Sequence, residues 1–134
     1  MDPRTQYKSS QAHSWTRIDM LLHVYDHAIS AIKEGAGALS RKENIDSKLL
    51  RIDAQSKVML IVDGLSPDQG SVPQNVLRIC EFIIDITCGD DPKAWRTAAE
   101  MLEVIRSGFD EIKDQARTAE AEGKIPTLDF AASQ

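Results

Sequence analysis

Residues Thr16 to Ile32 read TRIDMLLHVYDHAISAI, and this stretch decides the fold class. Thr16 and Asp19 have the spacing of a capping box, which marks the start of a helix. Gly35 and Gly37 weaken the C-terminal part of the segment. The sequence therefore predicts a helix over about residues 16–39. Its apolar side chains recur at steps of three and four residues on one side: Ile18, Leu21, Leu22, Tyr25, Ala28, Ile29 and Ile32.

Two more amphipathic segments follow, over about residues 45–63 and 72–88. The first has two adjoining apolar stripes, so we expect it to contact two neighbours, and Gly64 is its expected left-handed stop. The second is opened by a capping-box pair, Ser71 and Gln74, and closed by Gly89. The two stripes of the first segment are Ile45, Leu49, Ile52, Met59 and Leu50, Ala54, Val58, Ile61.

The last predicted helix has the clearest pattern. Asp91 is its expected N-cap and Pro92 its first residue. Gly108 interrupts the pattern at a cost of about 1 kcal/mol relative to alanine, which close approach of a neighbouring helix would explain. Gly123 and Pro126 are expected to end the helix. Its stripe is Trp95, Ala98, Leu102, Ile105, Phe109, Ile112, Ala116 and Ala119, with the alternating spacing of a bundle helix.

Four amphipathic helices with short connections, and no convincing strand, predict an all-α fold. We expect an antiparallel up-down four-helix bundle over residues 16–122. An N-terminal arm would occupy residues 1–15 and a flexible C-terminal tail residues 123–134. The apolar tail residues Ile125, Leu128 and Phe130 leave two alternatives open: a disordered end, or a segment that docks on the bundle or on a neighbouring copy.

Composition excludes several classes of function. The net charge of −5, with no basic block, argues against binding to nucleic acid. The longest apolar run, residues 58–62, is too short for membrane insertion, and the N-terminus does not read as a signal peptide. Cys80 and Cys88 would lie roughly 12 Å apart along one helix, which is too far for a disulfide. We interpret them as reduced thiols of a cytoplasmic protein.

The sequence contains no nucleophile elbow, no P-loop, no glycine-rich dinucleotide turn and no HExxH motif. We therefore predict that the protein is not an enzyme and binds no cofactor. The one local cluster to weigh is Asp19, His23 and His27, spaced four residues apart on one helix face. Two such histidines can chelate a metal. However, Asp19 is expected to bond within the capping box, and no fourth metal ligand lies nearby in the sequence. We therefore predict no metal site. A metal-dependent bundle enzyme is the weakest alternative.

The run from Leu22 to Ile29, LHVYDHAI, together with Tyr7 upstream and Ala54-Gln55 downstream, resembles the flagellin export chaperone family (FliS). The likeness covers about residues 7–109. Three departures mark a divergent member: Arg17 where proline is usual, His27 for a glycine and Cys80 for a tyrosine. Other residues that fit the family pattern are Leu65, Asn75, Ile79, Glu81, Phe82, Arg106 and Phe109.

The resemblance implies a cytoplasmic bundle that binds the disordered C-terminal region of newly made flagellin, prevents premature polymerisation and assists export. Components of the flagellar export apparatus would be further partners. The alternative is a helical-bundle adaptor or co-chaperone of the same system with a different client. On this basis our candidate partner-binding residues are Tyr7, Ile18, Leu22, Tyr25 and Gln55.

Two of these candidates, Tyr25 and Tyr7, could have a structural role in place of partner binding. Tyr25, like Phe109, lies on an apolar stripe, and we expect both to be structural first. Tyr7 is a lone aromatic residue in a polar segment. It either anchors the arm by packing or covers a client groove until the client arrives.

Overall fold

The computed structural model describes residues 16–42 and 46–124. All regular structure in these ranges is helical, which confirms the all-α prediction. The predicted arm with Tyr7, most of the predicted tail, and Ile45 lie outside the described residues. The elements are α2 (Arg17–Ser40), α3 (Ser47–Asp63), the short 3₁₀ helix η1 (Pro67–Gln69), α4 (Ser71–Ile86), α5 (Pro92–Glu111) and α6 (Lys113–Ala121).

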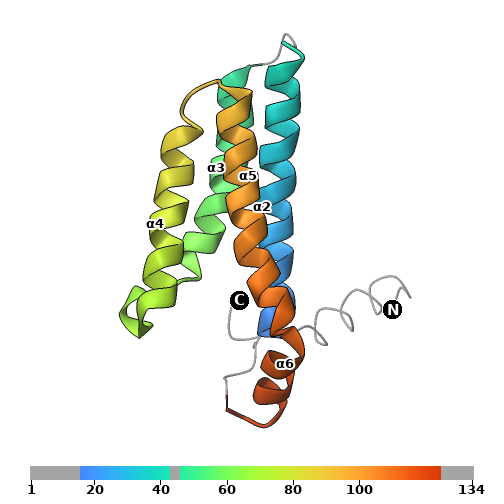
Figure 1. Ribbon diagram of the computed structural model, residues 1–134, viewed down its shortest axis with the longest axis vertical. Helices are drawn as coiled ribbons and strands as arrows, with labels where there is room; N and C mark the ends of the chain where they lie inside the picture. The colour runs from blue at the N-terminus through green and yellow to red at the C-terminus, as the bar shows by residue number, and fades with distance from the viewer. Residues whose placement is uncertain (1–15, 43–45, 125–134) are drawn as a thin grey trace, which may run out of the picture.

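The four long helices lie side by side, and successive helices run in alternating directions (Figure 1). Helix α2 packs against both α3 and α5, and α4 contacts α3 and α5 from the other side. The short α6 lies at the lower end of Figure 1, where it contacts the start of α2. Because all four long helices contribute buried side chains, a single core fills the space between them.

The start of α2 forms as its sequence predicts. Thr16 is the N-cap: its hydroxyl accepts from the Asp19 N–H at 3.3 Å, and Asp19 accepts from the Thr16 N–H at 3.2 Å. The helix then continues through both glycines to Ser40. Gly35 has a packing role, because a Cβ there would come within 2.8 Å of the Trp95 ring. Trp95 is fully buried, and its indole N–H donates to the Gly89 carbonyl at 2.8 Å.

Helix α3 contacts two helices, α2 and α4, as predicted. One of its two apolar stripes faces the core. In that stripe Ala54, Val58 and Ile61 are buried. The other stripe faces outward, with Leu49 63%, Ile52 64% and Met59 41% exposed. The predicted contact with two neighbours is therefore confirmed, although the second stripe remains exposed within the described chain. Gly64 caps the helix at φ −85°, so it is not a left-handed stop.

The predicted capping box of α4 is also wrong. Gly70 occupies the N-cap position at φ 128°, and Ser71 is already the first helical residue without a side-chain cap bond. The Gln74 side chain donates instead to the Pro67 carbonyl at 2.9 Å, within the preceding turn. At the other end α4 stops at Ile86, and Thr87 rather than Gly89 caps it. Local spacing alone thus misplaced both ends of this helix.

The last predicted helix is broken in two. Asp91 caps α5 and Pro92 opens it, as expected. At Ile112, with φ −100° and ψ 4°, the helix stops and α6 begins one residue later. Ile112 is 45% exposed and does not join the core. No atom of a neighbouring helix lies within 4 Å of a Cβ built on Gly108, so the predicted close approach is wrong within the described chain. Gly123 ends α6 at φ 78°, as expected.

The break at Ile112 lets α6 turn onto the start of α2. The Arg17 N–H donates to the buried carboxylate of Glu120 at 3.1 Å, and Arg117 forms an ion pair with Asp19. A carboxylate at a helix N-terminus also interacts favourably with the helix dipole. Polar contacts therefore hold α6 against the start of α2.

We predict that Arg117→Gln raises the pKa of Asp19. Burial acts to raise this pKa, but hydrogen bonds from Arg117 and Thr16 outweigh it and hold the pKa below its ordinary value of 3.8. The associated stability is therefore present above that ordinary value and is lost as the pH falls through the lower folded value. Titration of the Asp19 carboxyl signal by NMR measures the change. An identical pKa in both proteins would contradict a role for Arg117.

Candidate functional site

An apolar groove of about 340 Å³ lies between α4 and α5. Asn75 is the one lining residue with a polar side chain. At the groove's open end Val72 is 64% and Ile112 45% exposed, so large apolar side chains face solvent. The lining residues are Val72, Asn75, Val76 and Ile79 from α4 and Ile105, Gly108, Phe109 and Ile112 from α5.

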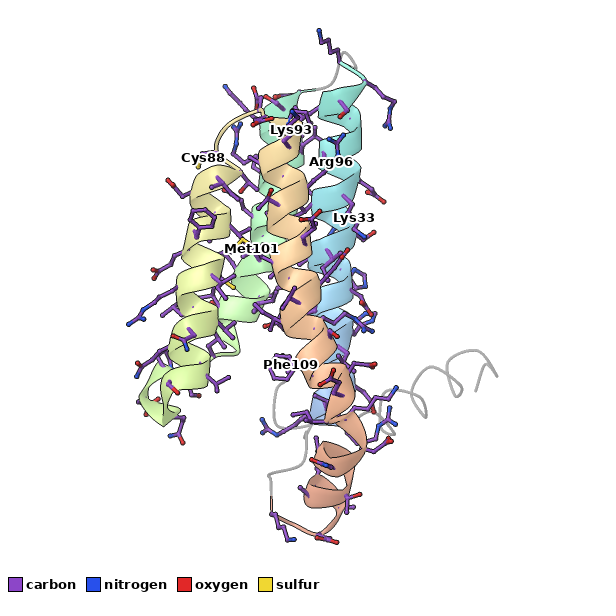
Figure 2. The ribbon with its side chains drawn as sticks, viewed as in Figure 1. Lys33, Cys88, Lys93, Arg96, Met101 and Phe109 are labelled. Atoms are coloured by element: carbon purple, nitrogen blue, oxygen red, sulfur yellow. The ribbon has the colours of Figure 1, made fainter. Side chains whose placement is uncertain are left out.

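The groove follows from the spacing of its residues on two helices that diverge. On each helix the lining residues recur at steps of three and four and cover about two turns, a length of roughly 10 Å. Helix α4 separates from α5 toward the lower end of Figure 1. Phe109 projects from this part of α5 toward the side on which α4 lies (Figure 2). The groove is therefore an open site on the surface that the core leaves unfilled.

Tyr25 stands behind the groove. It is fully buried and packs on Phe109, with ring centroids 5.7 Å apart. Its hydroxyl has no hydrogen-bond partner among the described residues. Burial, chiefly, raises the pKa of Tyr25 well above its ordinary value of 10.0, so the phenol stays neutral. Tyr25 thus supports the groove wall through Phe109 and is not accessible from solvent in this conformation.

Asp26 and Arg106 form a two-point ion pair between α2 and α5. Arg106 Nε lies 2.5 Å from Asp26 Oδ1, and its Nη2 lies 3.2 Å from Oδ2. Both side chains are partly exposed, so we expect the pair to contribute only about 0–1 kcal/mol to stability. Its geometric effect is to fix α5 against α2 beside the aromatic pair Tyr25 and Phe109.

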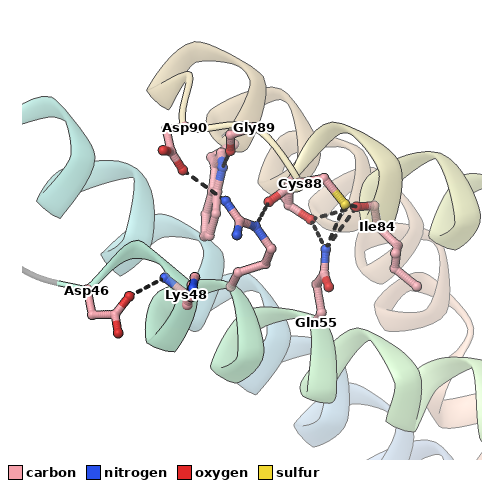
Figure 3. Close-up of polar contacts among 10 residues, drawn as sticks. Asp46, Lys48, Gln55, Ile84, Cys88, Gly89 and Asp90 are labelled. Carbon is pink, nitrogen blue, oxygen red and sulfur yellow. Dashed lines mark hydrogen bonds and ion pairs between the residues drawn. The ribbon is translucent and has the colours of Figure 1, made fainter.

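Gln55 of α3 binds the C-terminal end of α4 (Figure 3), and Arg51 of α3 binds the same end. The Gln55 amide N–H₂ donates to the Ile84 carbonyl at 2.9 Å and to the Thr87 hydroxyl at 3.0 Å. Arg51 donates to the Thr87 carbonyl at 2.9 Å and pairs with Asp90. These bonds satisfy carbonyl groups that a helix end leaves without partners. Gln55 therefore positions α4 at the end opposite the groove's open end.

Four of the five candidate residues lie in the described chain, and none of these four lines the groove. Ile18 and Leu22 are buried in the core, as is Tyr25, and Gln55 is engaged with α4. The sequence did place Ile105, Phe109 and Ile112 on one apolar stripe, but the spacing of a groove lining is the same as that of a buried stripe. The signal that could have revealed the groove is Val72, which continues the α4 stripe into the first turn of the helix and is 64% exposed there.

His23 and His27 remain exposed on α2, with ring centroids 4.3 Å apart. Asp19, the third member of that cluster, is bound to Thr16 and Arg117. Among the described residues no three metal-ligating side chains come together. The structure therefore adds no ligand to the pair of histidines.

No family model, no curated protein and no solved structure matches the chain. Within the described ranges, no helix has the length and apolar composition needed to cross a bilayer. The function of the groove must therefore be argued from its own geometry, with the family resemblance as a prediction from the sequence.

Proposed function

We propose that this protein is a cytoplasmic flagellar export chaperone built as an up-down four-helix bundle. It binds the disordered C-terminal segment of newly made flagellin, prevents premature polymerisation and assists delivery to the export apparatus. The observation that carries the proposal is the open apolar groove between α4 and α5. A chaperone for a disordered client needs such a surface, and a solvent-exposed apolar groove otherwise favours aggregation.

The lining of the groove favours a helical ligand. Asn75 alone offers a polar side chain, so an extended peptide would bury backbone N–H and C=O groups without partners. A helix satisfies these groups internally and presents apolar residues at three- and four-residue spacing. A disordered amphipathic segment can fold in this way as it binds, and the apolar contacts offset the entropy lost on ordering.

Residues that carry the family resemblance position the two helices that form the groove. Tyr25 packs on Phe109, Asp26 pairs with Arg106, and Gln55 holds the end of α4. The proposal thus gives these residues an indirect part in client binding, through the positions of α4 and α5. It requires binding and release only, with no catalytic step.

The direct test is calorimetric titration of the full chain with a flagellin C-terminal fragment. We expect one-to-one binding with a markedly negative heat-capacity change, because apolar burial is coupled to folding of the fragment. Absence of binding at tens of micromolar would overturn the proposal for that flagellin. Co-purification of a different protein from the native cytoplasm, with no flagellin present, would favour the adaptor alternative.

A further inference from the structure

Helix α4 is fastened to the bundle by polar contacts at one end. There Gln55 and Arg51 of α3 donate hydrogen bonds to the last carbonyl groups of the helix and its C-cap. Within the described chain, no side-chain hydrogen bond or ion pair joins residues 71–83 of α4 to another long helix, and the Gln74 side chain bonds to η1. The N-terminus of α4 has no side-chain cap and diverges from α5 (Figure 1). The polar contacts therefore define a pivot at the C-terminal end of α4.

The apolar contact of α4 with the core is narrow. Its buried residues are Val76, Cys80 and Ile83, and its contacts with α3 and α5 are far less extensive than those of α2 with the same two helices. Because apolar burial is the main force that holds helices together, separating α4 costs less than separating α2 from α5. The connection of residues 64–70 before α4 spans roughly 23 Å when extended, so it leaves the N-terminal end of α4 room to move.

Two polar groups are buried where α4 covers the core. Cys80 of α4 and Tyr25 of α2 are both fully buried in the same core cluster, and after burial it is the Cys80 thiol that raises the pKa of Tyr25. The Tyr25 hydroxyl has no hydrogen-bond partner among the described residues. A hydroxyl left unpaired in a core carries a desolvation cost, which water relieves when it gains access.

We propose that α4 is a hinged flap, which swings as an intact helix about its C-terminal end and uncovers the core face beneath it. The structure shows the closed state. In the open state the Tyr25 hydroxyl and the Cys80 thiol reach water, and the α4–α5 groove widens at the end where Val72 and Ile112 lie. The flap adjusts the width of the groove whatever ligand occupies it, so the inference does not depend on the proposed chaperone function.

Labelling of the Cys80 thiol measures the opening. Cys88→Ser leaves Cys80 as the only thiol of the chain. Burial raises the pKa of Cys80 to about 11, so the closed state reacts little with a disulfide reagent such as DTNB. We expect labelling at least about 10-fold faster than the free energy of unfolding from urea denaturation allows. Amides of α4 should exchange more slowly than the thiol reacts, because the helix stays intact as it moves.

Two destabilising substitutions separate opening of the flap from global unfolding. Val76→Ala removes a buried contact of α4 and should accelerate labelling about 10-fold. Gly35→Ala introduces a Cβ that collides with Trp95 between α2 and α5, a contact that the open state keeps. It should lower the free energy of unfolding and leave the labelling rate within about 2-fold. Tyr25→Phe should slow labelling about 5-fold, because the closed state no longer buries an unpaired hydroxyl.

Several results would overturn the inference. Labelling of Cys80 no faster than global unfolding would mean that α4 does not open by itself. Faster labelling in Gly35→Ala, in proportion to its loss of stability, would mean the same. Amide exchange throughout α4 at the rate of Cys80 labelling would mean that the helix unfolds in place of swinging. An unchanged labelling rate in Tyr25→Phe would remove the part assigned to the buried hydroxyl.

Discussion

Replacing Trp95 with alanine should lower the free energy of unfolding by about 3–5 kcal/mol, the usual cost of removing a buried aromatic side chain. Trp95 is fully buried, and its ring lies against Gly35 where α5 meets α2. Its N–H also bonds to the Gly89 carbonyl in the connection before α5. Urea denaturation followed by circular dichroism measures the loss.

Trp95→Phe provides the matched control. It keeps an aromatic ring but removes the N–H and part of the ring volume, so its cost should be clearly smaller than that of alanine. A loss below about 1 kcal/mol for Trp95→Ala would contradict the central position of this residue in the core. Equal losses for both variants would place most of the contribution in the hydrogen bond to Gly89.

Truncation of Tyr25 to alanine should also cost about 3–5 kcal/mol, because the ring fills the space between the core and Phe109. Tyr25→Phe should be neutral or stabilising. The Tyr25 hydroxyl is buried without a partner among the described residues, and removing such a group relieves a desolvation cost. Chemical denaturation of both variants gives the comparison.

Two results would contradict this account of Tyr25. A loss of more than about 1 kcal/mol in Tyr25→Phe would mean that the hydroxyl has a stabilising partner in solution. Loss of flagellin binding in Tyr25→Ala with unchanged stability would make Tyr25 a direct contact residue. A parallel loss of stability and binding agrees with its position behind the groove wall.

Features set by neighbouring residues could be predicted from the sequence. The capping box of Thr16 and Asp19 and the N-cap at Asp91 depend on contacts within one helical turn, so their residues specify them. The buried stripe of α2 was also predictable, because that helix packs against both α3 and α5 and its apolar side faces the core. The all-α fold followed from these elements.

Features set by distant residues could not be predicted in this way. The break at Ile112 accompanies contacts between α6 and α2, which are far apart in the sequence, such as the ion pair of Arg117 with Asp19. The role of Gly35 depends on Trp95, which arrives from another helix. Apolar spacing identifies which residues share a helix face but not whether a neighbour covers it. For that reason the spacing could not distinguish the outward stripe of α3 or the lining of the α4–α5 groove from a buried stripe.

The outward stripe of α3 makes the groove testable against a matched surface. Val72 at the groove and Leu49 on α3 are exposed to nearly the same extent, 64% and 63%. Each lies in the first turn of its helix, where a glutamate interacts favourably with the helix dipole. Val72→Glu and Leu49→Glu should therefore both fold with nearly unchanged stability, and they differ in the surface that receives the charge.

Calorimetric titration of these two variants with the flagellin C-terminal fragment tests the central claim most directly. A charge at the groove must be desolvated when an apolar helix docks, so Val72→Glu should weaken binding at least about 10-fold. Leu49→Glu should bind within about 2-fold of the wild type. Unchanged affinity in Val72→Glu, or a larger loss in Leu49→Glu, would contradict the assignment of client binding to the α4–α5 groove.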